Sequence, residues 1–235
     1  MTIYAFADVA GGSLIFVPSQ DQLVFAPGIA AASLRFATSG PDLLLMAAGE
    51  VLRLTNLGLG GAGLGAGNLV FQDGSQFFLD SITSSLRNGG AGHDWFAVDR
   101  GGADSVLGGA GDDYIEAGSA LGADDRLDGG AGNADRLAVS GTLTVTLGPA
   151  TVAGIELIEL RDGSITLVLD DATAATATPE PGAVFTVDAT RQGIGSVAVV
   201  SAAAVGAVGV ALLGGAGDDV LTGGLRGDSI VGGAG

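Results

Sequence analysis

The feature that most constrains the fold of this chain is a repeated nonapeptide. It has Gly at positions one and two, Asp at position six and an apolar residue at position eight. Copies occupy residues 89–97 (GGAGHDWFA), 108–116 (GGAGDDYIE), 214–222 (GGAGDDVLT) and 223–231 (GGLRGDSIV). The glycines allow a very tight turn, and the three residues that follow suit a short strand with its apolar residue inward. One such turn cannot bury that residue, so stacked turns are required, and the repeats predict a parallel β-roll or β-solenoid.

Degenerate copies lie between the clean ones and keep the spacing Asp-x-apolar. In the first block this spacing pairs each aspartate with an apolar partner, namely Asp94 with Phe96, Asp104 with Val106, Asp113 with Ile115, Asp125 with Leu127 and Asp135 with Leu137. The second block repeats it with Asp219 and Leu221 and with Asp228 and Ile230. The aspartates of the first block are 10, 9, 12 and 10 residues apart, so we expect turns of uneven length.

The alternation of short apolar runs with turn-forming residues predicts an all-β fold in four segments. Residues 1–80 read as a small antiparallel β domain, with a hairpin turn at Asp73-Gly74. The first repeat block occupies 88–138, and 139–212 reads as a β-solenoid without an aspartate ladder, interrupted by a surface loop at 170–182. The second repeat block occupies 212–235 and is truncated within a repeat.

Composition excludes several classes of protein. There are 26 acidic residues against 9 basic ones, all arginine, and the net charge of -17 repels nucleic acid and anionic membranes while attracting cations. No cysteine is present, so disulfides and thiolate metal sites are ruled out. The apolar run 197–213 contains Gly and Ser and favours buried strands over a membrane helix. The N-terminus lacks the features of a Sec signal peptide.

The sequence offers no catalytic constellation, and we expect no enzyme here. The G-x-G-x-x-G at 58–63 is followed by a strand-like stretch, whereas a dinucleotide site needs a helix there. His93 is the single histidine and holds a solvent-facing repeat position, so neither a zinc protease nor a Ser/His/Asp triad is supported. Trp95 points outward, either as a partly covered structural aromatic or as a contact with a neighbouring domain or partner.

The chemistry of the repeat favours calcium. Tight glycine turns expose backbone carbonyls, aspartates add carboxylates, and calcium takes six to eight oxygen ligands. Stacked aspartates repel one another without a cation, so folding should depend on calcium, with roughly three to seven ions bound. The alternative is that these aspartates only form turns. The first aspartate of each Asp-Asp pair, such as Asp112 and Asp218, should face solvent.

The repeats resemble the RTX, or haemolysin-type, calcium-binding nonapeptide. The stretch DLLLMAAGEVLRL and the following NLVFQDGSQFFL resemble the haemolysin-type calcium-binding related domain that often accompanies it. The resemblance implies calcium between the turns and export by type I secretion machinery through a C-terminal signal. It assigns ligand carboxylates to Asp94, Asp113, Asp219 and Asp228, and then to Asp104, Asp125 and Asp135. It assigns ligand carbonyls to Gly89, Ala91, Gly108, Ala110, Gly214 and Ala216.

The sequence therefore predicts a calcium-binding structural module of a secreted bacterial protein that folds outside the cell. One alternative is a building block of a cell-surface layer or adhesin, with self-assembly or cell-surface contact. Another is a non-catalytic appendage of a secreted enzyme. Calcium ions and the secretion machinery are the expected partners, without nucleic acid and without membrane insertion.

Overall fold

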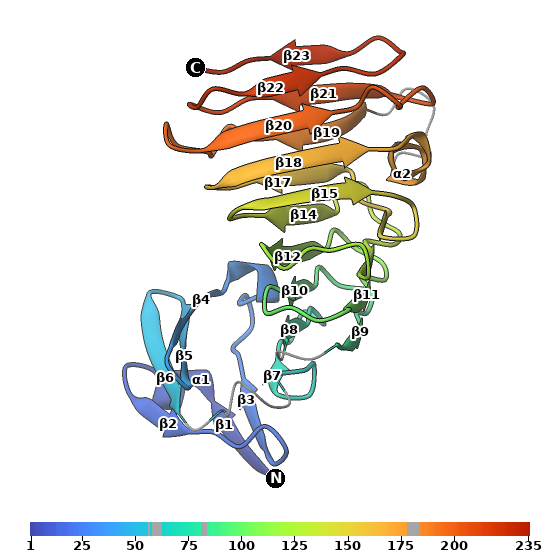
Figure 1. Ribbon diagram of the computed structural model, residues 1–235. Coiled ribbons are helices and arrows are strands. Elements are labelled where there is room, and N and C mark those ends of the chain that lie inside the picture. The colour runs from blue at the N-terminus through green and yellow to red at the C-terminus, as the bar shows by residue number, and fades with distance from the viewer. Residues whose placement is uncertain (56, 58–62, 81–83, 178–183) are drawn as a thin grey trace.

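The computed structural model describes residues 1–55, 57, 63–80, 84–177 and 184–235. The chain is nearly all β, and it forms a tall stack of strands with a smaller lobe beside its first turns (Figure 1). The N-terminus lies in the lobe and the C-terminus at the far end of the stack. The predicted β-solenoid is confirmed.

One face of the solenoid is an eight-stranded parallel sheet. Its strands, in spatial order from the lobe outward, are β8 (Phe77–Leu79), β10 (Trp95–Ala97), β12 (Tyr114–Gly118), β14 (Arg136–Val139), β17 (Leu157–Leu160), β19 (Val184–Asp188), β21 (Gly209–Leu213) and β23 (Ser229–Val231). Neighbours in this sheet are successive turns of one winding chain, which is why all of its pairs are parallel.

The opposite face is divided between two sheets. The first contains β9 (Leu86–Asn88), β11 (Ser105–Leu107), β13 (Arg126–Asp128) and β16 (Val152–Ala153). The second contains β15 (Leu143–Leu147), β18 (Ser164–Leu169), β20 (Val197–Ser201) and β22 (Val220–Thr222). The turn from 143 to 153 contributes a strand to each sheet, so the short strands of the first repeat block give way there to longer ones.

The core of the solenoid is a column of apolar side chains in register. On the eight-stranded face the column passes through Phe78, Phe96, Ile115, Leu137, Ile158, Val187 and Leu212. The rings of Phe78 and Phe96 stack with centroids 4.8 Å apart. All five apolar partners predicted in the first block are buried, whereas Ile230, in the last strand of the described stack, is 48% exposed.

The N-terminal lobe mixes parallel and antiparallel pairing. The strands β1 (Thr2–Ala5), β3 (Asp21–Val24) and β7 (Leu69–Val70) form a parallel sheet. A second sheet has the order β2 (Ser13–Ile15), β6 (Glu50–Thr55), β5 (Asp42–Ala47) and β4 (Arg35–Ser39). The helix α1 (Phe6–Val9) and the short 3-10 helix η1 (Ala31–Ser33) complete the lobe.

Two expectations for this lobe are wrong. Antiparallel pairing holds only for β4, β5 and β6, because β1 and β3 are joined by a crossover and run in the same direction. The turn at Asp73-Gly74 exists, with a Gly74 φ of 82°, but it does not close a hairpin. Its flanking strands diverge, since β7 pairs with β3 of the lobe and β8 pairs with β10 of the solenoid.

The lobe is attached to the solenoid through an aromatic cluster. Trp95 of β10, Phe36 of β4 and Phe77 of β8 contact one another, with ring centroids 5.3–5.5 Å apart, and Tyr114 of β12 lies 5.6 Å from Trp95. Only 6% of Trp95 is exposed. The outward position predicted for this residue is therefore a contact with the neighbouring lobe.

The surface loop predicted at 170–182 is partly a helix, α2 (Asp171–Ala177), and residues 178–182 lie outside the described part of the chain. Asp170 Oδ1 accepts the Thr173 N–H at 2.8 Å and caps the helix, which the alanine-rich run then extends. The run 197–213 forms β20 and β21, as predicted. Across the described residues, no helix has the length and apolar character needed to cross a membrane. The glycines at 58–62 also lie outside those residues.

Substitutions on the two faces of β18 should separate core from surface. Leu167 is fully buried, so Leu167→Ala should lower the free energy of unfolding by about 2–5 kcal/mol through lost burial and a residual cavity. The adjacent Thr166 points outward, and Thr166→Ala should change it by about 1 kcal/mol or less. Urea unfolding followed by circular dichroism measures both, and equal losses would contradict the inward register of Leu167.

Candidate metal centre

The aspartates singled out by the sequence lie on two opposite edges of the solenoid. Turns that lead into the eight-stranded sheet form the first edge, with residues 89–94, 108–113, 129–135, 154–156 and 223–228. Turns that leave this sheet form the second edge, with residues 98–104, 119–125 and 214–219. Each nonapeptide makes half a turn, so successive aspartates alternate between the edges. The first edge holds Asp94, Asp113, Asp135 and Asp228, and the second holds Asp104, Asp125 and Asp219.

Along the first edge each carboxylate accepts a backbone N–H from the preceding turn. Gln76 donates to Asp94 Oδ1 at 2.6 Å, and Asp94 donates to Asp113 Oδ1 at 2.8 Å. Asp113 in turn donates to Asp135 Oδ1 at 2.6 Å, and Asp135 to Glu156 Oε2 at 2.8 Å. The carboxylates therefore join the turns to one another and are themselves stacked in a row.

The second edge repeats this arrangement on a smaller scale. Ser85 donates its N–H and its hydroxyl to Asp104 Oδ1 at 2.9 and 3.1 Å, and Asp104 donates its N–H to Asp125 Oδ1 at 2.9 Å. Asp80 lies beside Asp104, and Arg87 approaches Asp80 Oδ1 at 3.1 Å. On this edge, therefore, a partly buried arginine is paired with one of the carboxylates.

Four of the aspartates close their own turn with a second hydrogen bond. The glycine N–H near the start of the turn donates to the carboxylate Oδ2, in the pairs Gly90–Asp94 (2.6 Å), Gly122–Asp125 (2.8 Å), Gly215–Asp219 (2.7 Å) and Gly224–Asp228 (2.7 Å). In the second block the other oxygens accept Ala198 N–H and Val210 N–H, at 2.8 and 3.0 Å. These carboxylates have both oxygens hydrogen-bonded to the backbone.

Two turns on the first edge are open, in the sense that no glycine N–H of the turn donates to the aspartate Oδ2. The Oδ2 atoms of Asp113 and Asp135 are buried and have no hydrogen-bond partner among the described residues. The second glycine of each turn, Gly109 or Gly130, adopts a φ of 111° or 99°, and its N–H does not reach the carboxylate. A buried carboxylate oxygen without a donor is strongly disfavoured, so this pair of oxygens calls for a cation or a proton.

The carbonyl oxygens that the sequence assigned as ligands are also free of hydrogen bonds. No described residue donates to the carbonyl of Gly89, Ala91, Gly108, Ala110, Gly214 or Ala216. By contrast, the carbonyls of Gly90 and Ala131 accept N–H groups from the neighbouring turn. The turns thus present unused carbonyl oxygens next to the aspartates.

Burial and like charges raise the pKa values of the stacked carboxylates. Burial is the main cause for Asp113, whose pKa rises to about 7, and the Asp94 and Asp135 charges contribute. The pKa of Asp135 rises to about 6 and that of Glu156 to about 7, again mainly through burial. Burial raises the pKa of Asp94 as well. Burial and the adjacent Asp80 together raise the pKa of Asp104 to about 7.

The neighbouring polar residues stay outside the two rows. Asp112 and Asp218 are exposed, as predicted. His93 is also largely exposed, and its Nδ1 accepts the Asp112 N–H at 2.8 Å. No three carboxylate or imidazole side chains converge on one point in the described ranges, so a metal at the first edge would have to combine two carboxylates with carbonyls.

Glu156 is the member of the row that sequence reasoning missed. It follows Asp135 on the first edge and carries the same spacing, because Ile158 two residues later occupies the inward column. The signal was Gly154-x-Glu-x-Ile, in which Glu replaces Asp and the leading Gly-Gly is lost. A pattern of any carboxylate followed by x-apolar would have found it.

In chelator, the free energy of unfolding should fall as pH rises from about 4 to about 7. Free carboxyls titrate near pH 4, and burial holds the pKa of Asp113 near 7, so the folded chain binds more protons in this window. Stability is therefore complete below the unfolded pKa and is lost as pH rises through the folded one. Urea unfolding at several pH values measures the slope. The double variant D113N/D135N should flatten it, and an unchanged slope would contradict the assignment.

Comparisons with protein-family models, with curated proteins and with solved structures find no match to this chain. The residues of the first edge provide two stacked carboxylates with unpartnered oxygens, a set of free carbonyls and no compensating arginine on the described part of the row.

Proposed function

We propose that this protein is a calcium-binding β-solenoid module whose turns are held together by bound ions. The observation that carries the proposal is the pair of buried, unpartnered Oδ2 atoms of Asp113 and Asp135 on successive turns. A divalent cation between these turns would satisfy both oxygens and remove the repulsion between them.

The donor set fits calcium better than other biological cations. All of the available groups are oxygens, from carboxylates and from the carbonyls of Gly108 and Ala110. Calcium takes six to eight oxygens in flexible geometry, whereas magnesium demands a near-ideal octahedron and zinc prefers nitrogen or sulfur. Asp113 and Asp135 would hold the ion, and the ion would supply positive charge and cross-links between turns.

Binding should be strongest at the open turns and weaker at the closed ones. In the turns of Asp94, Asp219 and Asp228 the Oδ2 atom already accepts a glycine N–H, so a cation there would compete with an existing hydrogen bond. The Asp104 and Asp125 edge has Arg87 nearby, which lowers its need for a further cation. We therefore propose calcium ligation by all seven aspartates, with the 108–135 turns as the principal sites.

Such a site couples folding to the calcium concentration. Ligands that bind only the folded chain stabilise it by mass action, by about 2.7 kcal/mol at a hundredfold excess over Kd. Extracellular calcium modules work at Kd values of about 10⁻⁴–10⁻³ M, so folding outside the cell is the natural use. Together with the RTX-like repeats, this supports a secreted bacterial module exported by type I secretion.

A building block of a cell-surface layer or adhesin, with self-assembly of the solenoid, is the second candidate. A third alternative is a non-catalytic appendage of a secreted enzyme.

Asparagine variants should separate open from closed turns. Asp113→Asn and Asp135→Asn remove a repelling charge, so each should keep or raise the stability in chelator while losing at least tenfold in calcium affinity. The matched variant Asp219→Asn alters a closed turn and should lower the stability in chelator by about 1 kcal/mol, with little effect on the tightest calcium site. Calorimetric calcium titration and urea unfolding with and without chelator measure both.

Equal losses of calcium affinity in all three variants would contradict the distinction between open and closed turns. A wild-type chain that binds no calcium at millimolar concentration, or whose unfolding free energy is the same with calcium and with chelator, would reject the proposed function itself.

A further inference from the structure

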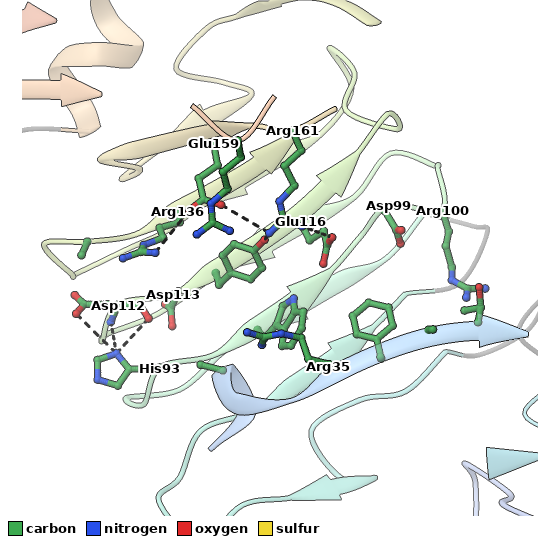
Figure 2. Close-up of a pocket in the computed structure, with 18 residues that line it drawn as sticks. Arg35, His93, Asp99, Arg100, Asp112, Asp113, Glu116, Arg136, Glu159 and Arg161 are labelled. Carbon is green, nitrogen blue, oxygen red and sulfur yellow. Dashed lines mark hydrogen bonds and ion pairs between the residues drawn. The ribbon is translucent and has the colours of Figure 1, made fainter. Parts of the chain in front are cut away.

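A large cavity in the described part of the molecule borders the turns of the first edge at His93, Asp112 and Asp113. It is a cleft of about 1000 Å³ between β4 of the lobe and the outward face of the eight-stranded sheet. Figure 2 shows Arg136, Glu116, Glu159 and Arg161 projecting from the sheet side, with Arg35 on the opposite wall. Its volume is in the range of pockets that hold small organic ligands, and is far larger than a single ion needs.

Arginines are concentrated in this cleft. Five of the nine basic residues of the chain line it, namely Arg35, Arg100, Arg136, Arg161 and Arg191. Five acidic residues also line it, so the cleft is formally balanced in a chain whose net charge is -17.

Two of these arginines make no ion pair with any described carboxylate. Arg35 donates to the Leu34 carbonyl at 2.7 Å and makes no ion pair with a described residue, and the same absence of ion pairs holds for Arg191. They lie on the two sides of the cleft, Arg35 in the lobe and Arg191 in the turn after β19. An uncompensated guanidinium on each side favours a ligand that carries a carboxylate or a similar anionic group.

The sheet wall carries paired charges and free donors. Arg161 donates to Glu116 at 2.9 Å and to the Tyr114 hydroxyl, and Glu159 lies 3.6 Å from Arg136. The Tyr114 hydroxyl accepts the Arg161 bond, so its own proton is free to be donated. The buried indole N–H of Trp95 has no hydrogen-bond partner among the described residues. This wall therefore offers both donors and acceptors to a ligand rich in hydroxyl groups.

We propose that this cleft binds a carboxylate-bearing saccharide, with Arg35 and Arg191 receiving the carboxylate. The acids Glu116, Glu159, Asp99 and Asp112 would repel a polyanion such as a nucleic acid or a polyphosphate, but they accept hydrogen bonds from sugar hydroxyls. A ligand with one negative charge among many hydroxyls matches both sets. The proposal goes beyond calcium binding and requires only the fold.

The test uses Trp95, the single tryptophan, which lies in the cleft and makes fluorescence a site-specific signal. Galacturonate and sialyllactose, each with one carboxylate, distinguish uronic from sialic acid, and galactose and lactose are their neutral controls. We expect saturable fluorescence shifts with at least one acidic sugar and at least tenfold weaker binding of the neutral ones. Arg35→Gln and Arg191→Gln should each weaken the acidic sugar about tenfold.

Arg226→Gln is the matched control, because Arg226 donates to the Gly206 carbonyl, makes no ion pair with a described residue and lies outside the cleft. It changes the net charge by the same amount and should leave sugar binding unaltered. Equal binding of acidic and neutral sugars, an equal effect of Arg226→Gln, an equal response to sulfate, or no binding at all would overturn the proposal. Calcium titration of the same variants should be unchanged, so a failure here is distinct from a failure of the calcium module.

Discussion

The bond between a buried carboxylate and a backbone N–H of the preceding turn is the constraint on which the solenoid depends. It joins Gln76, Asp94, Asp113, Asp135 and Glu156 into one row, at N···O distances of 2.6–2.8 Å. The same bond places carboxylates one strand spacing apart, about 4.7–4.9 Å, inside a medium that screens charge poorly. Cohesion and repulsion between the turns therefore come from the same atoms, and the balance is decided by whatever neutralises the row.

The sequence pattern predicted the features that depend only on residues near one another in the chain. The Asp-x-apolar spacing identified Phe96, Ile115 and Leu137 as inward residues, because alternation along a short strand fixes which side chain faces the core. It could not predict which turns are open. Within the described residues the tetrapeptide Gly-Gly-Ala-Gly occurs at 89–92, 108–111, 129–132, 214–217 and 232–235, yet only the copy at 108–111 has positive φ at both its second and fourth residues. Ala110 of this copy donates to Gly90 and Gly111 donates to Ala131, so hydrogen bonds to the turns on both sides accompany its conformation.

The fold of the lobe was less predictable than that of the solenoid, because strand pairing there does not follow from the sequence pattern. Its strands are short. Their composition does not show whether two consecutive strands pair with each other as a hairpin or belong to different sheets. The turn at Asp73-Gly74 formed as predicted, but β8 joined the solenoid because Phe78 completes the inward column by stacking on Phe96. The cleft was equally hidden, since Arg35 and Arg191 are 156 residues apart in the sequence and no motif links them.

One short segment serves both regions of the molecule. Asp113 belongs to the row at the first edge, and the next residue, Tyr114, forms part of the cleft wall and contacts Trp95. A cation that fixes the turn at Asp113 would also fix the start of β12, and with it the position of Tyr114. Calcium at the edge would therefore rigidify one wall of the cleft, even though the two proposed ligands carry opposite charge.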